Sequence, residues 1–331
     1  MTARRQWLRL AFGGALFSAL PAGRAAPRLP QALHWRERAL QGFGTTLWLR
    51  AAHANAADVE AGLDAAVGAI RTVEHQMSLF DPNSALCQLN RDATLDHPQP
   101  DLLAVLRLAR HISQRSQGAF DVTVQPVWAA WARAQRENRI PSDAELRSAL
   151  DRVDWRAVAI EPARVRLRRS GMALTLNGIA QGWAADRAKA ALQSFGVQHA
   201  LLDTGEWSEL GLSPEGAPWT LGIANPRAAD AVLARVCARG RAVATSSDAH
   251  LVFSADRMHH HILDPRTGRS PLELASVTVV APTGALADAL TKVIFMGGWQ
   301  RALALARQWN VDVFVVDKHG RWQASEGLAL T

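Results

Sequence analysis

Residues 172–202 read MALTLNGIAQGWAADRAKAALQSFGVQHALL, and their local pattern changes three times. Apolar and polar residues alternate over 172–176, as in a half-buried strand. Asn177-Gly178 then marks a turn, and the following residues to Phe195 are typical of a helix that Gly196 ends. A second strand is expected over 199–202. Sheet and helix therefore alternate within a short stretch of chain, joined by a glycine turn.

The rest of the chain also mixes helices and strands, without the strict alternation of βαβ units. Further helices are expected from Asp58 to about Val73, over 101–117, over 142–150 behind a capping box of Ser142 and Glu145, and over 286–295 and 299–309. Further strands are expected over 43–50, 157–168, 219–223, 232–237, 242–245, 251–254, 276–281 and 311–316. Residues 132–142 are expected to be the least structured. The prediction is an α+β fold with mixed or antiparallel sheets flanked by helices.

Composition excludes some classes of protein. The 331-residue chain is 48% hydrophobic and 20% charged, so it can bury a core and is not disordered. Its formal net charge is +7, but Arg4, Arg5, Arg9 and Arg24 all lie in the first 25 residues. The remaining arginines are scattered among acids and form no basic stripe. A nucleic-acid partner is therefore not expected.

The first 25 residues have the features of an export signal. Arg4-Arg5 precedes an apolar run over 10–20, which is shorter than the roughly 20 residues that span a bilayer. Small residues follow at Gly23 and Ala25. This pattern predicts a twin-arginine-type signal peptide over 1–25, a mature domain over 26–331 and a periplasmic location. The alternative is an uncleaved anchor, and either that anchor or the client protein would associate the chain with the inner membrane.

Five segments carry polar residues that a plain core would not need. They are the loop 118–123, the glycine turn before the helix at 179, the hydroxyl-rich 244–248, the histidine turn 259–268 and the helical 285–292. Glycines let a backbone approach a ligand closely, and a helix N-terminus favours phosphate. Each segment also has an ordinary structural explanation. Asp288 and Lys292, for example, are spaced as a helix ion pair worth about 0.3–0.5 kcal/mol.

In their order along the chain, these segments resemble the ApbE family of FAD:protein FMN transferases, from about Gly42 to Ser325. The resemblance begins at Met77–Ser84, which is similar to M-S-x-Y/F-x-P-x-S, and continues through Gly118–Pro126 (G-A-F-D-x-T-V-x-P), Thr175–Asp186 (D-L-G-G-I-A-K-G-Y-A-x-D), Thr245–Asp248 (T-S-G-D), His261–Gly268 (H-I-I-D-P-R-T-G) and Ser276–Leu290 (S-V-T-V-x-A-P-T…A-D-A-L). Each piece is unspecific alone, and the combination is specific.

The resemblance implies an ApbE-like fold that binds FAD in a cleft between two halves. A Ser or Thr hydroxyl of a target flavoprotein would attack the FMN phosphorus, and AMP would leave. His261 would be the general base, with Asp288 and Lys292 also catalytic. Mg²⁺ would be held by Asp288 and a backbone carbonyl of Gly178 or Ala180. Residues at positions that line the FAD site are Phe43, Phe80, Ala119, Phe120, Asp121, Thr175, Gln181, Ile262 and Thr291.

Departures from the family pattern cluster around the expected metal. Lys292 stands where the family has a metal-binding Thr, and Gln181 stands where it has Lys. A charged ammonium repels Mg²⁺ and cannot ligate it. One hypothesis is that Lys292 replaces a metal ion, wholly or in part. The other is that Lys292 turns to solvent while Mg²⁺ binds Asp288, carbonyls and water.

Two other functions remain open at this point. The first is an FAD pyrophosphatase, in which water replaces the protein hydroxyl and free FMN is released. The second is an exported flavin-binding protein without catalytic activity. Asn177, which replaces the first glycine of the family's glycine turn, and Lys292 would favour this function. His261 and Asp288 are retained and favour an active enzyme.

Overall fold

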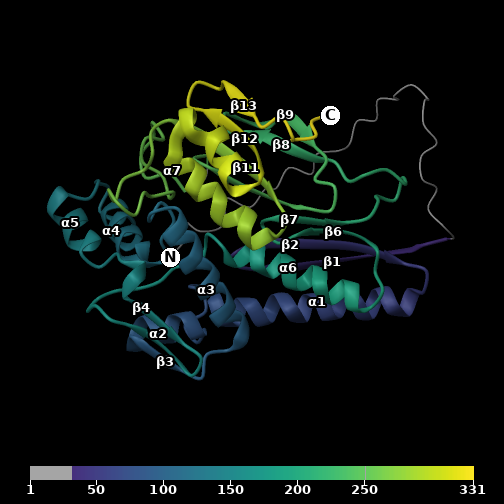
Figure 1. Cartoon of the computed structure of the whole chain (residues 1–331), viewed down its shortest axis with the longest axis horizontal. Helices are drawn as coiled ribbons and strands as arrows, with labels where there is room; N and C mark the ends of the chain where they lie inside the picture. Colours follow the sequence, from purple (N-terminus) through teal and green to yellow (C-terminus); the bar gives the residue numbers. More distant parts are fainter. Residues whose placement is uncertain (1–31, 250) are drawn as a thin grey trace.

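An eight-stranded antiparallel sheet runs through the centre of the computed structural model, which describes residues 32–249 and 251–331 (Figure 1). The strand order is β1-β2-β6-β7-β10-β11-β12-β13. These strands are β1 His34–Gly42, β2 Thr45–His53, β6 His199–Asp203, β7 Trp207–Leu210, β10 Ala242–Ser247, β11 Leu274–Ala281, β12 Asp312–Asp317 and β13 Trp322–Ala324. The predicted α+β class is confirmed. The predicted signal peptide, 1–25, lies outside the described residues.

Strand β11 shows why this sheet has a core on each side. All eight of its residues are buried. Val277 and Val279 face the larger core, whereas Val280 faces a second core that includes Trp219. The second core lies under a hairpin of β8 Leu221–Asn225 and β9 Ala228–Val236. A strand covered on both faces carries a nearly continuous apolar run, as residues 274–281 do apart from Ser276 and Thr278.

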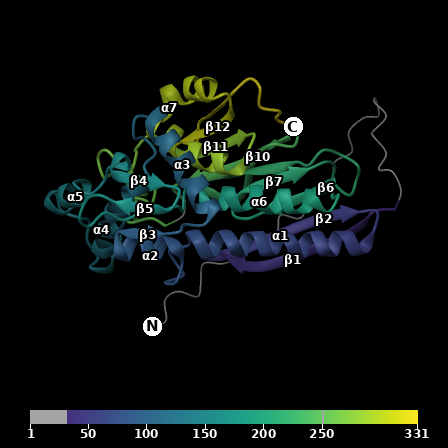
Figure 2. The same ribbon diagram turned by 60° about the horizontal axis from the view of Figure 1, so that its bottom comes forward.

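Several helices contribute to the larger core, and three of them pack on the central sheet. Helix α1, Ala56–Met77, buries Val59, Leu63, Ile70 and Val73 at helical spacing. It lies alongside α6, Ala180–Ser194, and packs against β1 and β2 (Figure 2). Helix α7, Gly284–Trp309, covers β10, β11 and β12. Its backbone is interrupted at Gly298, where φ is +72°, which agrees with the two helices expected there.

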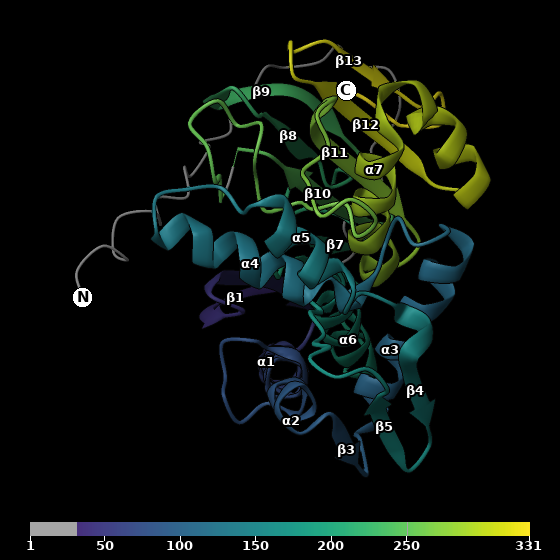
Figure 3. The same ribbon diagram turned by 90° about the vertical axis from the view of Figure 1, so that its left-hand side faces the viewer.

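A smaller region lies at one end of the sheet (Figure 3). It contains a three-stranded sheet in the order β3-β5-β4 and several helices. Their bounds are α2 Ala85–Asp92, β3 Thr94–Asp96, α3 Pro100–Arg115, α4 Gln125–Arg136, α5 Asp143–Leu150, β4 Val158–Glu161 and β5 Arg164–Leu167. Short 3₁₀ turns span Val122–Val124 and Trp155–Ala157. The capping box of Ser142 and Glu145 is confirmed. Within the described ranges, no helix is long and apolar enough to cross a membrane.

Several local predictions were wrong. Residues 172–176 alternate in burial but form no strand, because Leu174 bonds to the Asn90 side chain through both its N–H and its carbonyl (2.6 and 2.8 Å). The stretch 251–254 makes only an isolated bridge, between Val252 and His260. Helix α4 extends through 132–136, which was expected to be irregular. The prediction also missed β1, α2 and β7.

Candidate active site

The glycine turn before α6 is held in place by two other segments. Asn90 fixes Leu174, and the amide of Thr175 donates to the carbonyl of Val122 at 2.8 Å. The turn then meets α7. A β-carbon placed on Gly178 would lie 3.1 Å from Cε of Lys292 and 3.5 Å from Phe120. The structure therefore brings together the predicted site residues Gly178, Phe120 and Lys292.

Asp288 and Lys292 form an ion pair on α7. The ammonium of Lys292 donates to Oδ1 of Asp288 and to the main-chain carbonyl of the same residue, the latter at 3.2 Å. The Asp288 side chain is 1% exposed and that of Lys292 is 22% exposed. The amide of Gly182 approaches Oδ2 of Asp288 at 3.5 Å. The pair thus lies beside the N-terminus of α6, which begins at Ala180.

Glu206 belongs to this group, although it was not among the predicted site residues. It lies in the tight turn between β6 and β7 and is 6% exposed. Its carboxylate accepts a hydrogen bond from the amide of Thr245 at 3.1 Å. Burial raises the pKa of Glu206 well above its ordinary value; the charge of Asp288 adds to this and that of Lys292 opposes it. The signal for it in the sequence is the segment Asp203–Trp207, which reads DTGEW where the resemblance to the family has N-x-G-G-D.

Gln181 connects this turn to α6. Its Nε2 donates to the carbonyl of Thr204 at 3.1 Å, and the Thr204 hydroxyl donates back to the Gln181 carbonyl at 2.9 Å. Gly205 has φ of +92°, and a β-carbon there would overlap the Gln181 amide. The residue at the family's lysine position therefore joins α6 to the β6–β7 turn.

The end of β10 contacts α7 through hydroxyl groups. Ser246 Oγ lies 2.7 Å from Thr291 Oγ1, and Thr291 also donates to the carbonyl of Asp288 at 2.7 Å. Both residues are buried. Thr291, predicted to line the FAD site, thus lies in the packed interface between the sheet and α7.

The histidine segment, residues 259–268, packs against α7 and α4. His260 is fully buried, and its ring centre lies 5.8 Å from that of Phe295, which follows Lys292 by one helical turn. Burial, with the charges of Lys318 and His261, lowers the pKa of His260 to about 4. His261 is half-buried, its amide donates to the carbonyl of Leu251 at 3.0 Å, and Ile262 beside it is buried.

Trp131 of α4 contacts both ends of the segment: its ring packs on His259, and its Nε1 donates to the carbonyl of Gly268 at 2.7 Å.

A charged cluster lies just before the segment. Lys318 donates to the carbonyl of Arg257 at 3.0 Å. Lys318 (2.6 Å) and Arg227 (2.6 and 2.8 Å) also donate to the buried carboxylate of Asp248. Burial disfavours its ionised form, but these bonds outweigh that effect and hold the pKa of Asp248 below its ordinary value.

The remaining predicted residues lie on two segments. Asp121 is buried, and its carboxylate accepts from Thr123 (2.8 and 2.7 Å) and from the amide of Trp155 (3.1 Å), so it stabilises its own turn. Burial raises its pKa. Its neighbour Ala119 is also buried. Phe80 is 68% exposed and packs against Gly44, next to Phe43. The two aromatic rings thus come from segments that meet at the surface.

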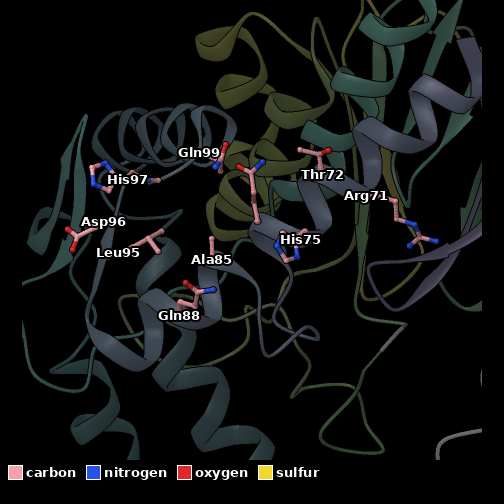
Figure 4. A pocket seen from close by; sticks show the side chains of 11 residues that line it. Arg71, Thr72, His75, Ala85, Gln88, Leu95, Asp96, His97 and Gln99 are labelled. Carbon is pink, nitrogen blue, oxygen red and sulfur yellow. The ribbon is translucent and has the colours of Figure 1, made fainter.

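Of two pockets in the described chain, one is lined by a predicted site residue, Asp121, and the other by none. A pocket of about 350 Å³ is lined by Gly118, Asp121, Trp155 and Arg266, among others. A pocket of about 530 Å³ lies between α1, α2 and β3, where Figure 4 shows His75, Gln88 and His97 at its walls. Neither is lined by His261, Asp288 or Lys292. The predicted FAD cleft between two halves of the fold stays a prediction.

The arrangement does not fit the predicted metal ligand set. In the parts of the chain that the structure describes, no three His, Cys, Asp or Glu side chains are grouped as metal ligands. Lys292 is the direct obstacle to a metal ion at Asp288. Its ammonium already bonds to the Asp288 carboxylate, and its side-chain carbons lie against Gly178. A divalent ion at that carboxylate would meet a positive charge at contact distance.

The comparisons with known proteins agree with the motif order. The model of the ApbE family matches residues 43–315. This chain belongs to the ApbE family. An FAD:protein FMN transferase of Treponema pallidum is 30% identical over 295 residues, which are 82% of this chain and 82% of that protein. One of Haemophilus influenzae is 28% identical over 265 residues and covers 75% of each chain.

Solved ApbE structures have the same fold. The ApbE protein of Thermotoga maritima superimposes with a TM-score of 0.79 at 26% identity, over 88% of this chain and 97% of that chain. The flavin transferase ApbE of Vibrio cholerae gives 0.77 at 25% identity, over 89% and 98%. The ApbE resemblance predicted from the motifs is therefore confirmed along almost the whole described chain.

Proposed function

We propose that this ApbE protein is an FAD:protein FMN transferase, which attaches the FMN half of FAD to a Ser or Thr of a target flavoprotein. Relatives that match three quarters or more of the chain carry that name. The structural observation that supports the proposal best is the meeting of Gly178, Phe120 and Lys292 at the start of α6. A glycine turn, a helix N-terminus and an ammonium together favour a diphosphate.

The reaction exchanges the phosphoanhydride bond of FAD for a phosphoester bond to the target protein. The target hydroxyl oxygen forms a bond to the FMN phosphorus, the bond from that phosphorus to the bridging oxygen breaks, and its electron pair leaves on the phosphate of AMP. His261 would take the hydroxyl proton as general base. The protein's task in such a transfer is to position the nucleophile and to stabilise the negative charge that develops.

The family resemblance also implies Mg²⁺ at Asp288, with a carbonyl of Gly178 or Ala180. Lys292 occupies the Asp288 carboxylate in this structure, so we assign no step to a metal ion. Asp288 is instead proposed to orient the ammonium, and Lys292 to face the diphosphate. Gln181 is proposed to keep the β6–β7 turn against α6, through its bonds with Thr204.

The test is to incubate the purified protein with FAD and candidate exported partners, and then to measure each partner's intact mass. The expected result is a partner heavier by one FMN group, with an equal amount of AMP. His261→Ala should abolish the adduct, whereas His111→Ala, a change at an exposed position of α3, should not. AMP with free FMN and no adduct would indicate the pyrophosphatase, and FAD binding without products would indicate the flavin carrier.

We also propose that the chain acts in the periplasm. This rests on the pattern of Arg4-Arg5, a short apolar run and small residues at 23–25. Cell fractionation should find the protein outside the cytoplasm. Replacing both arginines by lysine should retain it inside, and an unchanged distribution would argue against twin-arginine export.

A further inference from the structure

We propose that Lys292 binds the diphosphate of FAD as a built-in cation, so that this ApbE protein holds its substrate without a divalent metal ion. The inference rests on the proposed function and assigns Lys292 the part that the family resemblance gives to Mg²⁺. Three observations carry it: the burial of Asp288, the fit of the lysine stem and the donor that remains on the ammonium.

The Asp288–Lys292 pair differs from an ordinary helix ion pair. Exposed pairs at this spacing have both groups in solvent and contribute little. Here the Asp288 side chain is 1% exposed, and the ammonium meets both its carboxylate and its main-chain carbonyl. A buried carboxylate that loses its partner is strongly destabilised. A rotation of Lys292 to solvent, which Mg²⁺ binding at Asp288 would require, is therefore unfavourable in the free protein.

The lysine stem fits against the glycine turn. A β-carbon on Gly178 would lie 3.1 Å from Cε and 3.6 Å from Cδ of Lys292, so the absent side chain leaves room for the stem. A guanidinium is planar and larger than an ammonium, so we expect arginine to fit this space less well than lysine. Lys189, Lys292 and Lys318 are the only lysines among 37 Lys and Arg residues, so lysine at this position departs from the composition.

The ammonium has capacity left for a ligand. A lysine ammonium has three N–H donors, and among the described residues Asp288 accepts from two of them. The Lys292 side chain remains 22% exposed, and its stem runs past the turn where phosphate is expected. The third donor is therefore available to a phosphate oxygen of the ligand.

The deciding experiment needs no target protein. FAD affinity is measured by the quenching of flavin fluorescence in excess EDTA and again with Mg²⁺, and Mn²⁺ binding is measured by electron paramagnetic resonance. The unsubstituted protein should bind FAD with the same affinity, within twofold, in EDTA and in Mg²⁺. It should show no Mn²⁺ site that depends on Asp288. Lys292→Thr, which restores the family residue, should lose at least tenfold in FAD affinity in EDTA, gain a Mn²⁺ site and recover with Mg²⁺.

Two controls separate the role of this lysine from folding and general charge. Lys292→Gln removes the charge and keeps most of the stem, so it should weaken FAD binding in both buffers. Lys189→Gln removes a lysine that bonds to the carbonyl of Gly240 and should change neither measurement. Circular dichroism and thermal unfolding establish that each variant is folded.

The outcomes distinguish this inference from the proposed function. A Mn²⁺ site in the intact protein that Asp288→Asn removes, or FAD binding that requires Mg²⁺, would overturn the inference even if flavin transfer occurs. FAD binding in EDTA that depends on Lys292 would support it even if no transfer is found. In that second case only the proposed function would fail.

Discussion

Gly182 of α6 and Gly284 of α7 lie backbone against backbone. A methyl group on Gly182 would overlap the carbonyl of Gly284, and one on Gly284 would overlap the carbonyl of Gly182. Asp186 supports the same crossing, because its carboxylate accepts from the amides of Gly284 (2.6 Å) and Ala285 (3.0 Å) at the start of α7. This close approach brings Asp288 to the start of α6.

Gly182→Ala is therefore expected to force the two helices apart. We expect a loss of about 2–3 kcal/mol in the free energy of unfolding, as for other overpacked sites. Binding of FAD should weaken as well, because Asp288 moves away from the glycine turn. Chemical denaturation and FAD titration measure the two effects. In Gly68→Ala, where a β-carbon meets nothing within 4 Å, α1 should instead gain about 0.5–1 kcal/mol.

Asn90 is expected to control the shape of the glycine turn. Its side chain bonds to both the amide and the carbonyl of fully buried Leu174. Asn90→Leu leaves both groups unpaired and should cost about 1–3 kcal/mol of stability. Asn90→Asp keeps the acceptor and loses the donor, so its stability should lie between those of Asn90→Leu and the unchanged protein. Equal stability of Asn90→Leu and the unchanged protein would show that these bonds do not hold the turn.

Asp248 is expected to stabilise the chain that leads into the histidine segment, because its partner Lys318 also bonds to the carbonyl of Arg257. Its buried carboxylate is paired with Arg227 and Lys318, and breaking such a pair from one side costs about 3–5 kcal/mol. Asp248→Asn should show this loss at pH 7 by urea denaturation. Since the folded pKa of Asp248 lies below its unfolded value, its contribution is present above the unfolded pKa and falls as pH drops through the folded one. The difference in free energy of unfolding between Asp248→Asn and the unchanged protein should therefore become smaller in acid.

His260 should make the protein lose stability in mild acid. Its pKa falls from 6.5 to about 4 in the fold, so the unfolded chain binds more protons between these values and stability rises with pH there. The full shift corresponds to about 3 kcal/mol. Lys318, His261 and Asp248 are the charged or titratable groups that act on it. His260→Phe should remove this part of the slope when unfolding is measured from pH 4 to 7. Parallel curves would contradict the prediction.

Much of this protein could be predicted from local sequence. Three local features could be predicted because they depend on residues close together in the sequence. They are the capping box at Ser142, the amphipathic face of α1 and the break near Gly298. The order of the motifs was sufficient to indicate the ApbE family. The strand predicted at 172–176 failed because its alternation reflects burial, while its hydrogen bonds go to Asn90 and Val122.

The sequence by itself determined which chemical groups are present: the imidazole of His261, the acid of Asp288 and a lysine where the family has threonine. Only the tertiary structure decided which of them meet. It placed Glu206 beside the Asp288–Lys292 pair and turned the Asp121 carboxylate toward its own loop. The reason is that burial and electrostatic coupling depend on contacts between residues far apart in the chain. β2 pairing with β6 and α6 crossing α7 create those contacts, and no local pattern encodes them.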